Sequence, residues 1–220
     1  MIDDFREQTD EILVADDHAI IRDGLKKILA DTDDLEVVGE AGDGSATLQK
    51  VRERDWDLVI LDLSMPGRNG IELIKMMKDE RPKLKILVFS MHPEDQYAVR
   101  TIRAGASGYL SKEENSDLFI PAIRRVAGGG MFISPKVAEL LAQDVSHKTA
   151  PTHATLSNRE FEVLIRIVRG MSLTEISKEF SLSIKTISTH KTHILTKLSL
   201  NNQADLVRYA IENRLLDLEH

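Results

Sequence analysis

The chain has 220 residues, of which 42% are hydrophobic and 30% are charged, a composition typical of a folded globular protein. It contains no cysteine, which excludes disulfides, thiolate metal sites and thiol catalysis. The formal net charge is −7, but residues 1–127 carry 26 acidic and 18 basic side chains, whereas residues 151–216 carry 6 acidic and 9 basic ones. The overall negative charge therefore does not exclude a phosphate-binding surface in the second part of the chain.

No apolar run approaches the length that is needed to span a bilayer. Residues 1–10 are acidic and lack both the basic and the apolar regions of a secretory signal. We therefore expect a cytoplasmic protein that has no membrane partner.

The first 127 residues alternate short apolar runs with amphipathic stretches. The predicted strands are residues 12–15, 37–38, 58–61, 86–89 and 109–110. The predicted helices that follow them are residues 19–29, 45–54, 71–77, 93–104 and 116–127. This alternation predicts an α/β fold, with a five-stranded, doubly wound parallel sheet.

The pattern changes after three consecutive glycines at 128–130. Pro135 opens a short helix to about residue 143, and residues 144–155 form a polar linker. The rest is predicted to be all-α, with helices over about 158–168, 173–180, 184–198 and 202–215. Ser172 and Glu175 have the spacing of a capping box at the start of the second of these helices, and Ser183 can cap the third. We therefore expect a first domain over 1–130, a linker with a short helix over 131–154 and a small helical domain over 155–217.

Five polar residues follow or end strands of the predicted sheet: Asp16, Asp17, Asp62, Ser90 and Lys112. In a doubly wound sheet with the strand order 2-1-3-4-5, the strands that carry them are neighbours. Their carboxyl ends meet at one edge, so we expect these side chains to converge there.

Three carboxylates in one small site repel one another unless a cation is present. Mg²⁺ prefers oxygen ligands and keeps several waters, which suits this set. We assign Asp17 and Asp62 as direct ligands, the carbonyl of Ser64 as a third, and Asp16 as a ligand through water.

Asp62 is also the predicted nucleophile. A carboxylate can attack phosphorus to form an acyl phosphate, and the site then needs only to position groups and neutralise charge. Lys112 and Ser90 supply a point charge and a hydroxyl donor for the phosphoryl oxygens.

Residues 11–127 resemble the receiver domains of bacterial two-component response regulators, in the motifs Val-Ala-Asp-Asp-His at 14–18, Leu-Asp-Leu-Ser-Met-Pro-Gly at 61–67 and Gly-Ala-Ser-Gly-Tyr-Leu-Ser-Lys at 105–112. The resemblance implies a flavodoxin-like receiver that takes its phosphoryl group from a sensor histidine kinase, with Ser90 and Tyr109 sensing the phosphate. Glu113 stands where many receivers have proline. We also hypothesise that Ser64 and His92 border the attacking water and that His92 tunes dephosphorylation.

The predicted helix over 184–198 is amphipathic. One face lacks acidic residues and carries Lys185, Ser188, Thr189, Thr192 and Thr196, while the other carries Ile187, His190, Ile194 and Leu198. An acid-free face of hydroxyls and a lysine suits the major groove of double-stranded DNA. Thr186, His193 and Lys197 on one flank, and Lys191 on the other, suit the phosphate walls.

Residues 155–215 resemble the LuxR-type output domain of NarL-like and FixJ-like regulators, through Leu-Ser-Asn-Arg-Glu at 156–160, Gly-Met-Ser at 170–172, Ser-Ile-Lys-Thr-Ile at 183–187 and His190. The resemblance implies base contacts at Ser188, Thr189 and Thr192. It implies phosphate contacts at Lys185, Thr186 and Lys191. The chain departs from the family in having His193 where asparagine is usual and Ser199 where glycine is usual. In the family the last helix contributes to dimers, which would read two half-sites.

These observations predict a transcription factor, not an enzyme, that a histidine kinase activates by phosphorylating Asp62. The expected partners are the kinase, double-stranded DNA, a second copy of the chain and, as a further candidate, RNA polymerase. An aspartyl-phosphate phosphatase is one alternative, but it needs an acid where Ser64 stands. A dinucleotide-binding protein is a second, although Ala-Gly-Asp-Gly at 41–44 lacks the third glycine. A regulator switched without phosphate is a third.

Overall fold

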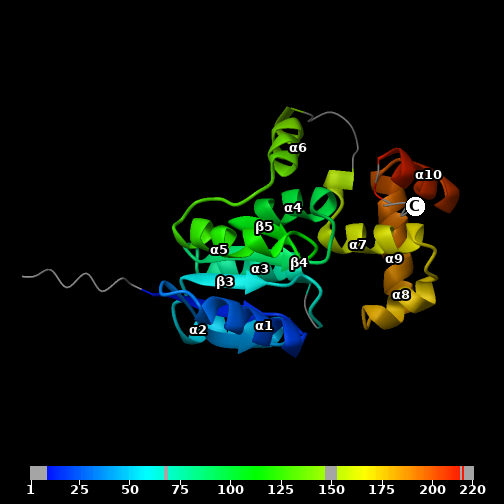
Figure 1. The fold of residues 1–220 in the computed structure, drawn as a ribbon. Coiled ribbons are helices and arrows are strands. Elements are labelled where there is room, and N and C mark those ends of the chain that lie inside the picture. The colour runs from blue at the N-terminus through cyan, green and yellow to red at the C-terminus, as the bar shows by residue number, and fades with distance from the viewer. Residues whose placement is uncertain (1–8, 67–68, 147–152, 214, 216–220) are drawn as a thin grey trace, which may run out of the picture. The chain divides into compact units, whose positions relative to one another are not determined.

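The computed structural model describes residues 9–66, 69–146, 153–213 and 215, and the chain divides into two compact units between residues 146 and 147. The first unit is built on one parallel sheet of five strands: β1 (Asp10–Ala15), β2 (Leu35–Ala41), β3 (Leu58–Leu61), β4 (Lys85–Ser90) and β5 (Gly108–Ser111). Their order in the sheet is β2-β1-β3-β4-β5 (Figure 1). The predicted α/β fold is confirmed.

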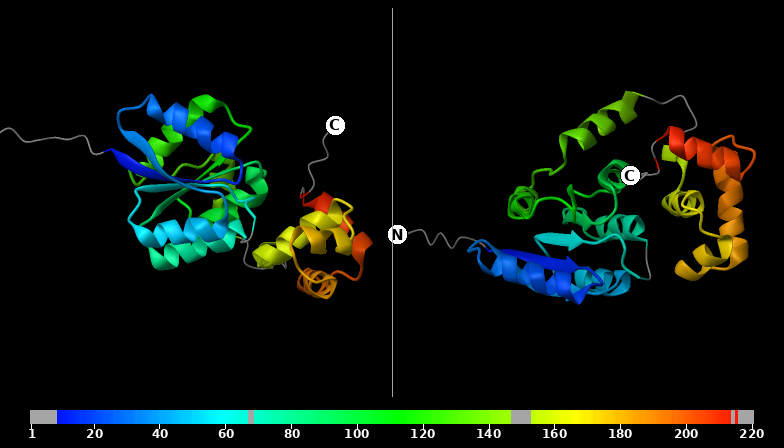
Figure 2. Two further views of the ribbon diagram at one scale, coloured as in Figure 1. Left: turned by 90° about the horizontal axis from the view of Figure 1, so that it is seen from below. Right: turned by 45° about the vertical axis from the view of Figure 1, so that its right-hand side comes forward.

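Helices cover both faces of the sheet. Helices α1 (Ala19–Ala30) and α5 (Phe119–Ala127) lie on one face, and α2 (Gly44–Glu53) and α3 (Gly70–Glu80) lie on the other (Figure 2, left), with α4 (Glu94–Arg103) packed beside α3. A short turn of 3₁₀ helix, η1 (Ser116–Leu118), precedes α5. Every residue of β3 is buried, because both faces of this central strand are covered.

The segment after α5 returns to the sheet and then packs on α4. The N–H of Tyr109 donates to the carbonyl of Phe132 at 2.9 Å, beside β5. Helix α6 (Pro135–Ser146) follows, with Val137 fully buried. The Ser134 hydroxyl donates to Glu94 at 2.9 Å, and Lys136 Nζ lies 3.0 Å from Asp95 Oδ2. The short helix of the predicted linker segment is thus attached to α4, within the first compact unit.

The second unit is entirely helical in its described part. After one turn of 3₁₀ helix, η2 (His153–Thr155), it contains α7 (Asn158–Val168), α8 (Leu173–Glu179), α9 (Ile184–Lys197) and α10 (Gln203–Glu212). Helix α9 contacts both α7 and α8, and α10 contacts α7. Their apolar faces meet in a core that includes Phe161, Leu164, Ile176, Ile187 and Ile194.

The helix starts in the second unit follow the predicted capping signals. Ser172 and Glu175 form a capping box at α8, and the Ser183 hydroxyl accepts from the N–H of Thr186 at 3.0 Å at the start of α9. Ser157 and Glu160 form a second capping box at α7. No helix in the described part of the chain is long and apolar enough to cross a membrane.

Candidate functional site

The carboxyl ends of four strands bring the predicted polar residues to one edge of the sheet. Asp16 directly follows β1, and the N–H of Asp62, directly after β3, donates to the carbonyl of Ala15 at 2.8 Å. Ser90 is the last residue of β4, and its carbonyl accepts from the N–H of Lys112 at 2.9 Å. Backbone hydrogen bonds between neighbouring strand ends therefore hold all four residues in register.

Lys112 joins two of the three carboxylates. Its Nζ lies 2.6 Å from Asp16 Oδ2 and 2.8 Å from Asp62 Oδ2. The Asp16 and Asp62 side chains are each 3% exposed and that of Lys112 is 7% exposed, so this charge cluster is largely shielded from water. Burial opposes the charge on Lys112, but its hydrogen bonds to Asp16 and Asp62 outweigh burial and raise the pKa of the ammonium group.

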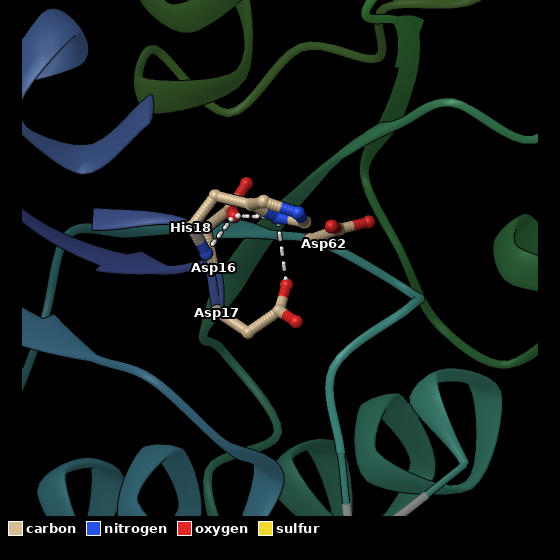
Figure 3. A group of neighbouring side chains, drawn as sticks. All are labelled: Asp16, Asp17, His18 and Asp62. Carbon is tan, nitrogen blue, oxygen red and sulfur yellow. Dashed lines mark hydrogen bonds and ion pairs between the residues drawn. The ribbon is translucent and has the colours of Figure 1, made fainter. Parts of the chain in front are cut away.

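The third carboxylate lies at the open side of this cluster, with a histidine above it. His18 Nδ1 is 2.9 Å from Asp17 Oδ1 and 3.3 Å from Asp16 Oδ1 (Figure 3). One ligand atom from each of Asp16, Asp17, His18 and Asp62 lies within 4.8 Å of the others. These residues fit a single hard cation, because three of the four offer the carboxylate oxygens that Mg²⁺ takes as ligands. The sequence analysis gave His18 no role. Its position directly after Asp16 and Asp17 was the one sequence feature that could have placed it at this cluster.

The loop after Asp62 runs close to the start of α3. The N–H of Ser64 donates to Asp62 Oδ1 at 3.2 Å, which directs this loop back toward the carboxylate. A Cβ at Gly70, the first residue of α3, would lie 2.7 Å from the Cα of Leu63. Only glycine permits this approach, so Gly70 helps to position the loop that carries Ser64.

Ser90, His92 and Tyr109 are linked by hydrogen bonds beside the carboxylate cluster. The N–H of His92 donates to the fully buried Ser90 hydroxyl at 3.3 Å, and the Tyr109 hydroxyl donates to the carbonyl of His92 at 2.6 Å. Tyr109 is 2% exposed, and burial raises the pKa of its hydroxyl. His92 Nε2 lies 3.2 Å from Ser64 Oγ, and its ring stacks on Tyr97 with centroids 4.2 Å apart. The predicted switch residues Ser90 and Tyr109 therefore both contact His92.

Glu113, which replaces a usual proline, lies in a short turn. Its N–H donates to the hydroxyl of Ser111 at 3.2 Å, and the N–H of Glu114 donates to the Ser111 carbonyl at 3.2 Å. These two bonds close the turn directly after Lys112.

Helix α9 presents its polar residues on the exposed side. Ile187, Ile194 and Leu198 are buried, whereas Lys185 and a row of hydroxyl residues are exposed: Ser188, Thr189, Thr192 and Thr196. The two faces are those that the sequence predicts. The Thr189 hydroxyl donates to the carbonyl of Lys185 at 3.0 Å, and the Thr192 hydroxyl donates to the carbonyl of Ser188 at 3.1 Å.

Three of the predicted flanking residues are held by the rest of the second unit. Lys191 Nζ donates to Gln203 Oε1, in α10, at 2.8 Å. Lys197 Nζ lies 2.7 Å from Glu160 Oε2, and His193 Nδ1 lies 3.7 Å from Glu160 Oε1. His193 and Lys197 thus both contact the carboxylate of Glu160 in α7, while their side chains stay 58% and 42% exposed, and their role at phosphate walls stays a prediction.

Glu160 is a structural residue that the sequence analysis did not single out. Its side chain is 5% exposed, and Oε2 also accepts from the N–H of Ser157 at 2.7 Å. Burial favours the neutral acid, but the hydrogen bonds from Lys197 and Ser157 outweigh burial and lower the pKa of the carboxyl group. His190, which the sequence places on the apolar face of α9, is half-buried, and burial lowers its pKa.

The chain thus combines a doubly wound α/β domain, with a carboxylate and lysine cluster at its sheet edge, and a small helical domain; comparison with known proteins gives the family. Residues 12–124 match the response regulator receiver domain, and residues 154–210 match the bacterial regulatory proteins of the luxR family. The chain belongs to the two-component response regulators of the NarL/FixJ type, which are DNA-binding transcription factors and not enzymes. The phosphatase and dinucleotide-binding alternatives are therefore rejected.

Relatives align over almost the whole chain. The oxygen regulatory protein NreC of Staphylococcus haemolyticus is 37% identical over 215 residues, covering 94% of this chain and 99% of NreC. NreC of Staphylococcus aureus strain JH9 is 38% identical over 216 residues, with the same coverage.

Two solved structures of RcsB also align with almost the whole chain. The Salmonella typhimurium response regulator RcsB is 30% identical with a TM-score of 0.69, over 93% of this chain and 98% of that one. RcsB from Salmonella enterica serovar Typhimurium, solved on promoter rprA with the phosphomimetic BeF₃⁻, is 30% identical with a TM-score of 0.65, over 92% and 98%.

Proposed function

We propose that Asp62 is the phosphoacceptor of this response regulator and that its phosphorylation by a sensor histidine kinase controls DNA binding through α9. The observation that carries the proposal is the bridge that the buried Lys112 side chain makes between Asp16 and Asp62, at 2.6 and 2.8 Å, at the edge of the sheet. The ammonium group of Lys112, between these two carboxylates, is placed to bind the oxygens of a phosphoryl group on Asp62.

In the proposed reaction, a carboxylate oxygen of Asp62 attacks the phosphorus of a phosphohistidine. The new P–O bond forms as the P–N bond breaks, and the leaving nitrogen of the kinase imidazole keeps the electron pair of that bond and takes up a proton from water. Lys112 and the Ser90 hydroxyl then bind the phosphoryl oxygens. Because Ser90 and Tyr109 both contact His92, movement of Ser90 toward the phosphate disturbs the bond that holds Tyr109 in place.

We assign a Mg²⁺ ion to the three carboxylates, with Asp17, Asp62 and the carbonyl of Ser64 as direct ligands and Asp16 as a ligand through water. When it is bound, the ion neutralises the carboxylates and the phosphoryl oxygens, so that an anionic donor can approach. One carboxylate oxygen from each of Asp16, Asp17 and Asp62 lies within 4.8 Å of the others, which supports a shared ion at these three residues.

Phosphorylation is tested by mass spectrometry after incubation with acetyl phosphate, a small phosphodonor, and Mg²⁺. One phosphoryl group is expected on the wild-type protein, and none on Asp62→Asn or when EDTA removes the metal. Asp55→Asn is a matched control, because Asp55 is an exposed aspartate that precedes β3 at the opposite end of the strand. A phosphoryl group on Asp62→Asn would overturn the assignment.

For the output domain we propose that α9 lies in the major groove, with Ser188, Thr189 and Thr192 at base edges and Lys185, Thr186 and Lys191 at phosphates. Lys191 then leaves Gln203, which it contacts here. We further propose that phosphorylated chains bind as dimers to two half-sites, with α10 contributing to the contact.

Two substitutions separate these roles. Lys185→Ala should weaken binding to specific and random DNA alike and reduce the salt dependence, because it removes a phosphate contact. Thr192→Ala should change base preference and leave binding to random DNA largely intact. Fluorescence anisotropy on both kinds of duplex measures the two effects, and an equal loss on both duplexes for Thr192→Ala would contradict its role at a base.

A further inference from the structure

One large apolar residue lies uncovered at the start of α9. Ile184, the first residue of this helix, is 49% exposed, although the other isoleucines of α9, Ile187 and Ile194, are fully buried. Ile184 is therefore outside the core of its own unit.

The start of the helix does not depend on Ile184. The hydroxyl of Ser183 accepts from the N–H of Thr186 at 3.0 Å, and its carbonyl accepts from the N–H of Ile187 at 3.1 Å, so Ser183 alone supplies the cap. A β-branched residue is also a weaker helix former than many polar residues that would suit an exposed first turn. Neither helix capping nor core packing explains an exposed isoleucine here.

The position of Ile184 on the helix places it beside the residues proposed to read bases. It precedes Ser188 by four residues and Thr192 by eight, so the three side chains follow one another along the same side of α9. In helix-turn-helix domains, residues near the start of the second helix contact base edges. Among major-groove edges, only thymine carries an apolar group, its C5 methyl.

We propose that Ile184 contacts the C5 methyl group of a thymine and is thereby a residue that determines the sequence specificity of this regulator. The inference rests on the proposed placement of α9 in the major groove. It adds an apolar contact to a recognition surface whose other members are two lysines and four hydroxyl residues.

The test removes the thymine methyl group and the isoleucine separately and together. A binding sequence is first selected from a random DNA pool with the full chain and beryllium fluoride as the phosphoryl mimic. Each thymine of that sequence is then replaced by uracil, which lacks only the C5 methyl. Dissociation constants are measured for the wild-type protein, Ile184→Ala and Ile184→Val.

We expect one thymine in each half-site at which uracil weakens wild-type binding about fourfold, as for the loss of one buried methyl group. Ile184→Ala should bind the thymine and uracil duplexes equally at that position. Ile184→Val, which keeps the branch at Cβ, should retain most of the difference. Ile28→Ala is the matched control, because Ile28 is a 42% exposed isoleucine on α1, and it should behave as the wild type does.

The inference would be overturned if uracil weakened the binding of Ile184→Ala as much as it weakens that of the wild type. It would also be overturned if no uracil substitution changed the dissociation constant of the wild-type protein. Since Ile184 is not packed in the core, Ile184→Ala should melt within a few degrees of the wild type, and Ile184→Val provides a second variant. If sequence-specific binding persists while the methyl effect is absent, only this inference fails. If the selection yields no preferred sequence, the proposed function fails with it.

Discussion

The hydroxyl of Tyr109 donates a 2.6 Å hydrogen bond to the backbone carbonyl of His92, which joins β5 to the loop after β4. The same residue, His92, donates its N–H to Ser90 and faces Ser64. His92, a single loop residue, thus contacts Ser90, Tyr109 and Ser64 beside the carboxylate cluster.

Tyr109→Phe should uncouple phosphorylation from DNA binding. It removes the hydroxyl, which bonds the His92 carbonyl and the Ser90 side chain, so we expect a loss of about 0.5–1.5 kcal/mol in the free energy of unfolding, measured with urea. The gain in DNA affinity on phosphorylation should shrink, while the rate of phosphorylation by acetyl phosphate stays at the wild-type value. A wild-type gain in affinity would show that this hydroxyl has no part in the switch.

Lys112→Met should destabilise the first unit, because the buried carboxylates of Asp16 and Asp62 would then lie close together without a cation between them. We expect a loss of about 1–3 kcal/mol in the free energy of unfolding. Mg²⁺ should restore part of the loss, and the double variant Lys112→Met, Asp62→Asn should be more stable than Lys112→Met alone. Urea titrations with EDTA and with Mg²⁺ measure both effects; insensitivity of Lys112→Met to Mg²⁺ would contradict a shared charge cluster.

His92→Ala should shorten the lifetime of the acyl phosphate severalfold, because the imidazole, 3.2 Å from the Ser64 hydroxyl, lies beside the Asp62 carboxylate and its removal leaves more room for water there. The half-life is measured from loss of the phosphorylated mass after removal of the phosphodonor. Ser64→Ala, which keeps the imidazole, should have a smaller effect. An unchanged half-life in His92→Ala would end this hypothesis.

Glu160→Gln should destabilise the second unit by about 1–2 kcal/mol at neutral pH, since it removes a charge that Lys197 and Ser157 stabilise. The pKa of Glu160 is lowered from its ordinary value of 4.5, so its contribution is present above that value and is lost as the pH falls through the folded-state pKa. The difference in stability between the wild type and Glu160→Gln should therefore shrink below pH 4.5. A difference that grows on acidification would have the wrong sign.

Ser199→Gly should stabilise the second unit by about 0.5–1 kcal/mol. Ser199 ends α9 with a φ of +55°, in the left-handed region that glycine enters without strain. The N–H groups of Ser199 and Leu200 donate to the carbonyls of Thr196 and Leu195, a Schellman motif, so the conformation is fixed by the helix end. Ser199→Ala, which keeps the Cβ, should give no gain in thermal unfolding, and a gain equal to that of Ser199→Gly would exclude backbone strain as the cause.

The convergence of Asp62, Ser90 and Lys112 could be predicted from the sequence, because a parallel sheet places all its carboxyl strand ends at one edge. The exposed face of α9 could be predicted for a similar reason, since helical periodicity alone separates Thr192 from Ile194. Both predictions depend on regular geometry and on short stretches of sequence.

Other features depend on contacts between distant segments and could not be predicted. The full length of β2 was missed because Gly39 interrupts its apolar run; a Cβ there would lie 2.3 Å from the ring of Trp56, so the glycine makes room for that ring. The bond between Lys197 and Glu160 was missed because it joins two helices 37 residues apart in the sequence. A lysine at the edge of a polar helix face gives no local sign of which partner it meets.

The hydroxyl groups of Thr189 and Thr192 both donate their hydrogen bonds to backbone carbonyls of their own helix. In that rotamer each hydroxyl oxygen exposes only its lone pairs. It can therefore accept a hydrogen bond from a base edge but cannot donate one. The exocyclic amino groups of adenine and cytosine are the complementary donors on the major-groove edge, whereas guanine O6 and thymine O4 are not. In the proposed major-groove placement of α9, reading a guanine or thymine oxygen would require each threonine to break its backbone bond first, so we expect a preference for adenine and cytosine at the positions that the two residues face.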